Sequence, residues 1–376
     1  MSIRRHKIRV GTNMGVDYCQ KRNIILPHRQ FVIHREWDIM AIMNRVYSRL
    51  NKEPHPRYNW LHNDLGLSRS RLFHLYNGVS SSSKPWITTV ESSFTELQSR
   101  AFDPFEYLSR DTCKAMLHIS QWSYDLQLRQ LNPDMKDLII PKMRVLHPPQ
   151  ALLTEGPICN DFGREAVRFI LVGNAFFRKG GYETLIGLER LREEGYTFTL
   201  DIVGEMFYGK LNRRAFGDER PENVKTIVAR NPRYYTLHGM LSNEKTLALI
   251  RQCDVGLLPS LMERYGFVVL EYMALGLPVV TTNQRVFPEV NHSSRGWLAQ
   301  LLTEQQEIKW RTVKEKRTTS ALLEEELYRV FRTILKCPEQ ISDKSRQAIQ
   351  YIAKNHNPDV FMKDIAELYF QALNDD

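Results

Sequence analysis

The sequence of 376 residues has few of the features that mark secreted, disulfide-stabilised or membrane-spanning proteins. Its five cysteines are scattered, odd in number and never spaced as Cys-x-x-Cys: Cys19, Cys113, Cys159, Cys253 and Cys337. This pattern argues against a disulfide framework or a zinc cluster, and it predicts a reducing, cytoplasmic setting. No apolar run is long enough to cross a bilayer, because the longest candidate, 267–280, contains Glu271. The N-terminal residues MSIRRHKIRV also lack the apolar core of a secretion signal.

Acidic residues are scarce in the first fifty positions, where ten Lys and Arg stand against three Asp and Glu. This segment therefore carries +7 of the chain's net charge of +9. A basic face favours anionic partners such as phospholipid head groups, nucleic acid or an acidic glycan. No recognised reading motif accompanies the charge, so we expect no nucleic acid. The alternatives that remain are peripheral contact with the inner face of an anionic membrane, an acidic glycan and a plain solvated surface.

The length of the chain suits two domains rather than one core. The segment Leu146–Gln150, with its consecutive prolines, is typical of a stiff connection. We predict an N-terminal domain over 1–148, a linker over 149–164 and a second domain over 165–350. A terminal helix is expected over 351–376, because apolar residues recur on one side of it. Those residues are Val360, Phe361, Ile365, Leu368, Tyr369 and Leu373.

The segment GLLPSLMERYGFVVLEYMALGLPVVTT, residues 256–282, is the most informative part of the chain. It predicts a buried strand, a Pro-Ser turn, an acidic loop ending at Gly266 and a helix over Phe267–Leu275. Glu263 precedes this helix and Glu271 lies within it. A helix N-terminus binds phosphate through free backbone N–H groups, and carboxylates accept hydrogen bonds from sugar hydroxyls. The combination suits a nucleotide sugar, although two glutamates at this spacing also occur in many α/β proteins without function.

A second phosphate-binding pattern lies upstream of the first. The apolar stretch RFILVG, residues 168–173, predicts a strand that ends at Gly173. It is followed by a loop with Arg178 and Lys179 and by a helical stretch to about Leu191. Cations and glycines between a buried strand and a helix favour an anion site.

Together the two patterns resemble the donor site of family 4 of the retaining glycosyltransferases, and the resemblance covers roughly 165–300. It implies an α/β architecture of GT-B fold, two facing Rossmann-like domains with a C-terminal helix that crosses back to the first. In that family the first glutamate faces the donor sugar and the second binds the ribose, roles that fall on Glu263 and Glu271. Lys179 matches the cation that clamps the diphosphate.

This sequence departs from the family pattern at a few positions. Asn174 replaces the usual arginine, and Arg178 is the neighbouring cation that would take its place. Arg264 and Tyr265 stand where small or aromatic residues are commoner. The resemblance further implies that the loop Gly239–Leu241 approaches the nucleobase. The implied donor-binding residues are Gly173, Asn174, Arg178, Gly239, Met240, Leu241, Gly266, Phe267 and Glu271.

The N-terminal half predicts strands over 72–76, 85–92 and 115–120, and their spacing resembles the first domain of the same family. His74 and Asn77 match its histidine-rich strand end and are acceptor-side candidates. Glu91 stands where the family has a histidine that contacts the donor sugar, so it is either functional or an exposed strand end. His118 lies in an apolar strand and is interpreted as a core histidine. Residues 11–15 resemble a shortened version of the family's glycine-rich loop.

We therefore predict a retaining glycosyltransferase that moves a sugar from a nucleoside diphosphate sugar to a glycan or lipid-linked acceptor in polysaccharide or glycoconjugate synthesis. Lys179, Glu263 and Glu91 are the predicted catalytic residues. No Asp-x-Asp motif lies in a loop that could hold a divalent ion, so we expect no metal and no cofactor besides the donor. The alternatives are a sugar-nucleotide epimerase and a non-catalytic subunit of the same fold. The nucleotide base, sugar and acceptor are left open.

Overall fold

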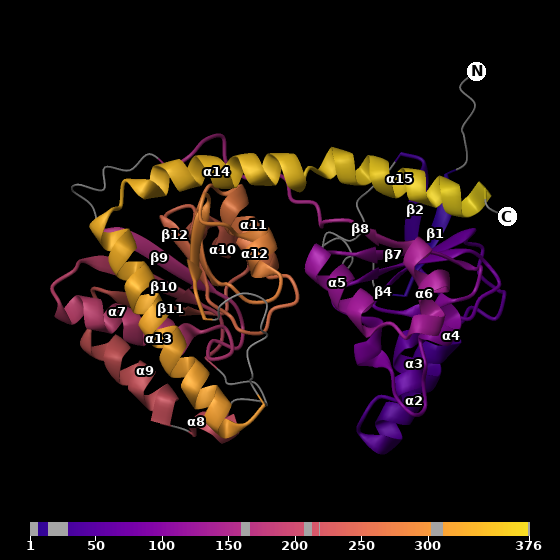
Figure 1. Cartoon of the computed structure of the whole chain (residues 1–376), viewed down its shortest axis with the longest axis horizontal. Coiled ribbons are helices and arrows are strands. Elements are labelled where there is room, and N and C mark those ends of the chain that lie inside the picture. Colours follow the sequence, from indigo (N-terminus) through magenta and orange to yellow (C-terminus); the bar gives the residue numbers. More distant parts are fainter. Residues whose placement is uncertain are drawn as a thin grey trace. The chain divides into compact units, whose positions relative to one another are not determined.

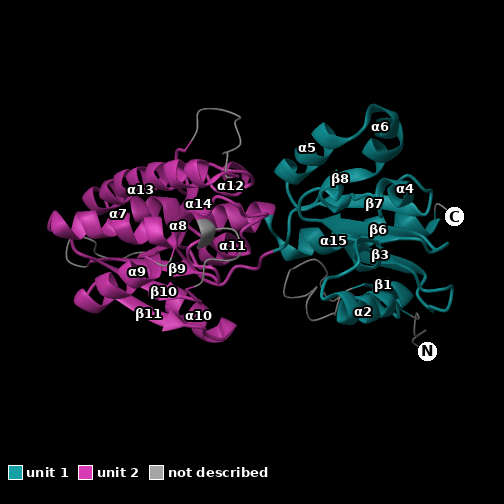
Figure 2. Cartoon of the chain, turned by 90° about the horizontal axis from the view of Figure 1, so that it is seen from below, with its two compact units in different colours: residues 1–149, 356–376 teal, residues 150–355 magenta. Residues whose placement is uncertain are grey.

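The computed structural model describes residues 7–13, 29–158, 166–206, 213–217, 219–301 and 311–374, with backbone alone at 213 and 214. The chain forms two compact units, each with its own parallel sheet (Figure 2). Unit 1 comprises 1–149 and 356–376, and unit 2 comprises 150–355. The predicted fold class, two Rossmann-like units with a C-terminal helix on the first, is confirmed.

The sheet of unit 1 has six parallel strands in the order β2-β1-β4-β6-β7-β8. Their bounds are Ile8–Thr12 (β1), Phe31–Arg35 (β2), Leu72–Tyr76 (β4), Trp86–Val90 (β6), Cys113–His118 (β7) and Met143–Val145 (β8). A short parallel pair, β3 (Leu61–His62) with β5 (Val79–Ser80), lies beside it. All five residues of β4 and of β6 are buried, as expected for central parallel strands covered on both faces.

Helices cover the two faces of the unit 1 sheet (Figure 1). Their bounds are Ile39–Asn51 (α2), Pro56–Trp60 (α3), Phe105–Leu108 (α4), Gln121–Gln130 (α5), Pro133–Ile139 (α6) and Pro358–Asn374 (α15). Side chains alternate along each strand, so Leu72 packs with α15 in one cluster and Phe73 packs in the other. The predicted apolar side of the terminal helix contacts this sheet through Phe361, Ile365 and Tyr369. Val360, which was expected on the same side, is instead 55% exposed.

Unit 2 has six parallel strands in the order β11-β10-β9-β12-β13-β14. The strand bounds are Val167–Val172 (β9), Phe198–Val203 (β10), Tyr235–Gly239 (β11), Val255–Leu258 (β12), Val279–Thr282 (β13) and Gly296–Ala299 (β14). The helix bounds are Gly181–Glu193 (α7), Arg213–Phe216 (α8), Glu219–Arg230 (α9), Asn243–Ile250 (α10), Phe267–Ala274 (α11), Phe287–Val290 (α12), Val313–Lys336 (α13) and Gln340–Asn355 (α14). One core cluster joins the sheet to α7 and α13.

A buried histidine ties the unit 1 sheet to the terminal helix. Nδ1 of His74 lies 2.7 Å from the hydroxyl of Tyr369, and Nε2 lies 2.7 Å from Oγ1 of Thr89. Burial lowers the pKa of His74 to about 3, so the imidazole is neutral and one ring N–H donates while the other nitrogen accepts. Each ring nitrogen thus has a partner inside the fold.

We expect Tyr369→Phe to lower the free energy of unfolding by about 1–3 kcal/mol, because it leaves a buried imidazole nitrogen without a partner. Urea unfolding followed by circular dichroism measures the change. Tyr328→Phe is the matched control, since its hydroxyl also makes a 2.7 Å hydrogen bond, to Glu194, but at the surface. Equal losses of stability in the two variants would contradict the structural importance of the His74 contact.

Candidate functional site

The candidate site of unit 2 lies where the order of the strands reverses. From β9 the chain proceeds outward through β10 and β11, and it then returns to β12, which pairs with the other side of β9. The loops 173–180 and 259–266 leave the carboxyl ends of these two neighbouring strands. Open parallel sheets bind their ligands at such a switch point, outside the carboxyl ends of the strands. The two patterns recognised in the sequence are thus brought to one place.

A shared carboxylate joins these two loops. Nζ of Lys179 donates to Oε1 of Glu263 at 3.1 Å, and Nη1 of Arg178 donates to the same oxygen at 3.3 Å. Nη1 of Arg178 also donates to the carbonyl oxygen of Met262 at 3.2 Å. The side chains of Lys179 and Glu263 are each 13% exposed and that of Arg178 is 34% exposed. Two cations share one anion, so the group carries a net positive charge that an anionic ligand can neutralise.

Glycine at position 173 makes room for the lysine. A Cβ on Gly173, whose φ is 149°, would lie 2.5 Å from both Cδ and Cε of Lys179. The stem of Lys179 therefore passes directly over the end of β9. Gly180, with φ of 76°, precedes α7, and a Cβ there would lie 2.5 Å from the carbonyl oxygen of Pro259. The start of α7 is thus packed against the loop that carries Glu263.

Buried hydroxyls hold the loop that carries Glu263. Oγ1 of Thr282 donates to the carbonyl oxygen of Ser260 at 2.8 Å, and Oγ of Ser260 donates to that of Arg178 at 3.4 Å. Ser260 and Thr282 are fully buried. Neither Ser260 nor Thr282 was predicted from the sequence to support the site. The Pro-Ser pair that follows β12 was the signal for Ser260, whereas no sequence pattern marked Thr282.

Glu271 lies one turn into α11, a helix preceded by Gly266 with no side-chain cap on its N-terminus. Its side chain is partly buried, and desolvation raises the pKa of its carboxyl group. A hydroxyl donor would stabilise the charged form and offset part of this desolvation. The position suits the ribose-binding role that the resemblance implies, which stays a prediction.

The other donor-side candidates also lie at the carboxyl edge of the sheet. Asn174 follows Gly173 and is exposed. Phe267 is the first residue of α11. Gly239 ends β11 with φ of 63°, and Met240 after it is 58% exposed. Because β10 separates β11 from β9, the loop starting at Gly239 begins about 10 Å from the end of β9.

The candidates of unit 1 lie at the equivalent edge of its own sheet. Asn77 and Glu91 follow the neighbouring strands β4 and β6, and Oδ1 of Asn77 accepts the backbone N–H of Glu91 at 3.0 Å. Glu91 is buried rather than an exposed strand end. His74 is 1% exposed and bonded on both nitrogens, so its ring offers an acceptor almost no surface. His118 is fully buried, as interpreted from the sequence.

Asn13, which was named from the sequence only as part of the loop 11–15, lies at the switch point of unit 1. The order of strands there reverses between β1 and β4. Asn13 follows β1, accepts the backbone N–H of Tyr76 at 3.0 Å and donates to the carbonyl oxygen of Tyr76 at 3.2 Å. Gly11 and Thr12 belong to β1, so of the predicted glycine-rich loop only Asn13 is a described loop residue. Met14 and Gly15 lie outside the described residues.

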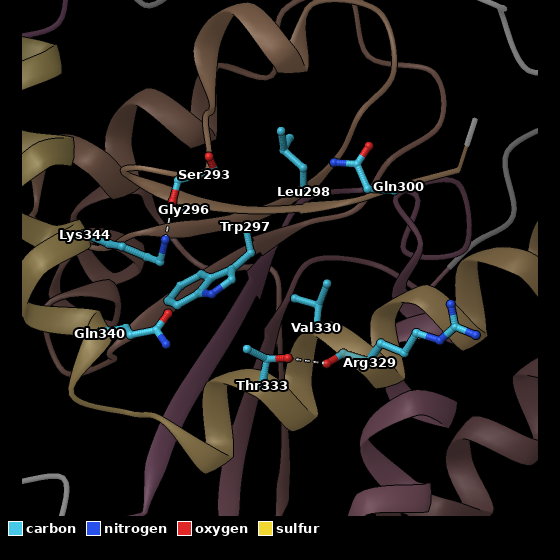
Figure 3. A pocket seen from close by; sticks show the side chains of 10 residues that line it. All are labelled: Ser293, Gly296, Trp297, Leu298, Gln300, Arg329, Val330, Thr333, Gln340 and Lys344. Atoms are coloured by element: carbon cyan, nitrogen blue, oxygen red, sulfur yellow. Dashed lines mark hydrogen bonds between the residues drawn. The ribbon is translucent and has the colours of Figure 1, made fainter. Parts of the chain in front are cut away.

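A separate pocket of about 300 Å³ lies between β14 and the helices α13 and α14 (Figure 3). Trp297 is one of its lining residues, with Nζ of Lys344 5.0 Å from the ring centroid. Lys344 also donates to the carbonyl oxygen of Ser293, and Arg329 lies at the other end. Because β14 is the edge strand of the sheet, this pocket is distant in the fold from the switch point.

Among the residues that the structure describes, no group of three or more His, Cys, Asp and Glu could hold a metal ion. Over the same ranges, no helix has both the length and the apolar character needed to span a membrane.

Part of this chain is similar in sequence to known proteins. Residues 166–309, which contain the whole switch-point site, match the family model described as glycosyl transferases group 1. A glycogen synthase of Mycobacterium tuberculosis is 34% identical over 114 residues, which is 30% of this chain and 25% of that protein. An amylovoran biosynthesis glycosyltransferase of Erwinia amylovora is 28% identical over 145 residues, or 36% of this chain and 32% of that protein. The chain thus spans about a quarter to a third of the length of these curated relatives.

Solved structures resemble the chain over nearly its whole length. Sucrose-phosphate synthase of Thermosynechococcus elongatus has a TM-score of 0.61 at 13% identity and covers 98% of this chain and 100% of its own. HepE of Anabaena in complex with UDP has a TM-score of 0.60 at 12% identity, over 97% and 100% of the two chains. At this level of identity the likeness establishes the fold.

Proposed function

We propose that this chain, whose residues 166–309 belong to the glycosyl transferases group 1 family, transfers a sugar from a nucleoside diphosphate sugar to a glycan or lipid-linked acceptor. The observation that carries the proposal is the convergence of Lys179 and Arg178 on Glu263 at the switch point of unit 2. A net positive charge between two helix N-termini is suited to a diphosphate. A carboxylate beside it is suited to sugar hydroxyls.

In this proposal each polar group has one task. Lys179 stabilises the negative charge that grows on the diphosphate as the bond between sugar and oxygen breaks, and Arg178 assists it. Glu263 exchanges its contact with the cations for a hydroxyl of the donor sugar. Glu271 accepts hydrogen bonds from the ribose, and Gly239, Met240 and Leu241 approach the base.

Cationic side chains also make the proposed reaction independent of a divalent metal, because they neutralise the leaving diphosphate themselves. Retention of configuration follows from the family resemblance. UDP-sugars are suitable first donors to test, since HepE of Anabaena was solved with UDP and with UDP-glucose. A polysaccharide acceptor is supported by the relatives named for glycogen synthesis and amylovoran biosynthesis.

The experiment is to incubate the chain with UDP-glucose and with other nucleotide sugars, with and without glucan acceptors, in the presence of EDTA. We expect nucleoside diphosphate release that depends on acceptor, and an anomeric configuration, determined by NMR, that matches the donor. Conversion of the donor without any acceptor would support an epimerase instead. Activity that vanishes with EDTA and returns with a divalent metal would contradict the proposed role of the cations.

We expect Glu271→Ala to weaken nucleotide binding by about 1.5–3 kcal/mol, because a charged hydrogen-bond acceptor for the ribose is lost. Isothermal titration with the preferred nucleoside diphosphate measures the change. Glu339→Ala, an exposed glutamate between α13 and α14, is the control and should bind as the wild type does. Equal affinity of Glu271→Ala and wild type would exclude Glu271 from the site.

The pH dependence of binding gives a second test of the same residue. Because burial raises the pKa of Glu271, this carboxyl group takes up its proton at a higher pH than an ordinary glutamate does. We therefore expect the nucleotide affinity of the wild type to fall on acidification before the usual carboxyl range is reached. The affinity of Glu271→Ala should not show this early fall.

A further inference from the structure

Helix α2 of unit 1, Ile39–Asn51, is amphipathic but contains no buried residue. It begins at Asp38, whose side chain accepts the backbone N–H of Met40 at 3.0 Å. On the inner side, Oδ1 of Asn44 accepts the backbone N–H of His55 at 2.9 Å, and Met40 packs against the unit 1 core. The helix is therefore held in place, and its outer side is available for a partner.

The outer side of α2 is apolar. Ile42, Met43, Val46 and Leu50 recur every three to four residues, which places them on one face. Val46 is 55% exposed and Leu50 is 78% exposed. These four residues, with the exposed Trp37 that precedes the helix, are called the α2 stripe below. A contiguous exposed apolar surface of this kind marks an interaction site rather than a solvated face.

Positive charge borders the α2 stripe. The helix itself contains Arg45 and Arg49 and no acidic residue, and both arginines are exposed. Lys52 and Arg57, which follow closely in the chain, are exposed as well, whereas Glu53 is the acidic residue of this stretch. An apolar face with arginines at its border and a tryptophan at one end is the composition of helices that lie in a membrane interface.

We propose that α2 docks in the head-group region of an anionic phospholipid membrane, with the α2 stripe inserted and Arg45 and Arg49 at the lipid phosphates. The positive charge beside the α2 stripe favours a membrane over a second copy of this chain as the partner. In a symmetric pair of copies the same patch meets itself, so the four cations of each copy would face those of the other. An anionic lipid surface complements the apolar and the basic residues at once.

The inference goes beyond the proposed transfer reaction and does not depend on it, because lipid binding is measured without donor or acceptor. It assigns a place to the peripheral membrane contact that the basic N-terminal segment predicts. Such docking would hold unit 1, on which the acceptor-side candidates lie, at the surface that presents a lipid-linked acceptor.

The test is co-sedimentation of the full chain with vesicles of phosphatidylcholine alone or of equal parts phosphatidylcholine and phosphatidylglycerol. We expect binding to the anionic vesicles, weaker binding at high salt, and little binding to the neutral ones. Val46→Glu/Leu50→Glu should lower the partition coefficient about tenfold or more, because two apolar contacts are lost and two anions are added. Arg45→Gln/Arg49→Gln should lower it about fivefold for each cation removed.

Leu138→Glu is the matched control, since Leu138 is an exposed leucine on α6 of the same unit and should tolerate the charge without loss of vesicle binding. Thermal melting establishes that each variant is folded. The proposal is overturned if the wild type does not co-sediment with anionic vesicles, or if Val46→Glu/Leu50→Glu binds them as the wild type does. It is also overturned if sedimentation velocity without lipid shows self-association that this double variant abolishes, because the stripe then belongs to a second copy.

Discussion

Lys179→Ala is expected to lower kcat about a hundredfold to a thousandfold, the range found when one donor to a developing anion is removed. The Michaelis constant for the donor should rise far less. The reason is that charge accumulates on the diphosphate only as the bond to the sugar breaks, so the lysine stabilises the transition state more than the bound donor. Its stem is fixed over Gly173 and its ammonium group lies at the end of β9, which limits the freedom it would lose on binding.

Arg178→Ala and the double variant separate the two cations. Arg178 is more exposed than Lys179 and also bonds the carbonyl oxygen of Met262, so its removal alone should have the smaller effect. Because Asn174 carries no charge, the double variant should be slower than either single variant. Lys179→Arg serves as the conservative control and should recover part of the rate. If all three alanine variants change only the Michaelis constant, the cations bind the donor without taking part in catalysis.

Glu91→Gln is expected to lower turnover about tenfold to a thousandfold, by comparison with typical acid–base and electrostatic contributions. Glu91 lies at the carboxyl end of β6, the edge at which open parallel sheets bind ligands. A carboxylate there would accept a hydroxyl of the donor sugar or stabilise positive charge at its anomeric carbon. The amide has the same shape, so the substitution removes the charge while the packing around a buried side chain is kept.

The matched control for Glu91 is Glu96→Gln, because Glu96 is an exposed residue of the short 3-10 helix Phe94–Leu97 and its substitution should leave turnover unchanged. Both variants should melt close to the wild-type temperature, because neither changes the size of a side chain. A Glu91→Gln enzyme with the wild-type rate would reduce Glu91 to a structural residue of the sheet edge. A large fall in the melting temperature of Glu91→Gln would likewise indicate that Glu91 has a structural role.

The strands of unit 2 and the meeting of its two polar loops could be predicted because their signals are local. The apolar runs of β9, β10 and β12 end in loops with glycine, cations or carboxylates, and parallel strands gather such loops at one edge. Lys179 and Glu263 lie 84 positions apart, yet the alternation of strand and helix places both at the switch point.

Contacts between residues far apart in the chain, and the exposure of a helix face, could not be predicted from local sequence patterns. His74 matches a functional motif, but its buried contact with Tyr369, 295 positions away, is a property of the folded chain. The apolar residues of α2 recur with a helical period, but the sequence does not show that they face outward rather than into a core. The start of α13 has a local signal, the capping box of Thr312 and Glu315, but the packing of this helix against the unit 2 core depends on residues far away in the chain.

The most direct test of the central claim, that unit 2 binds a nucleoside diphosphate at Lys179, Glu263 and Glu271, is a thermal-shift titration of the full chain with UDP, GDP, ADP and dTDP. A ligand that binds the native state alone raises the melting temperature as its concentration increases. We predict that one of the four raises it in the wild type and that Glu271→Ala requires a higher concentration for the same shift. No shift with any of the four nucleotides or their sugars at millimolar concentration would contradict the account.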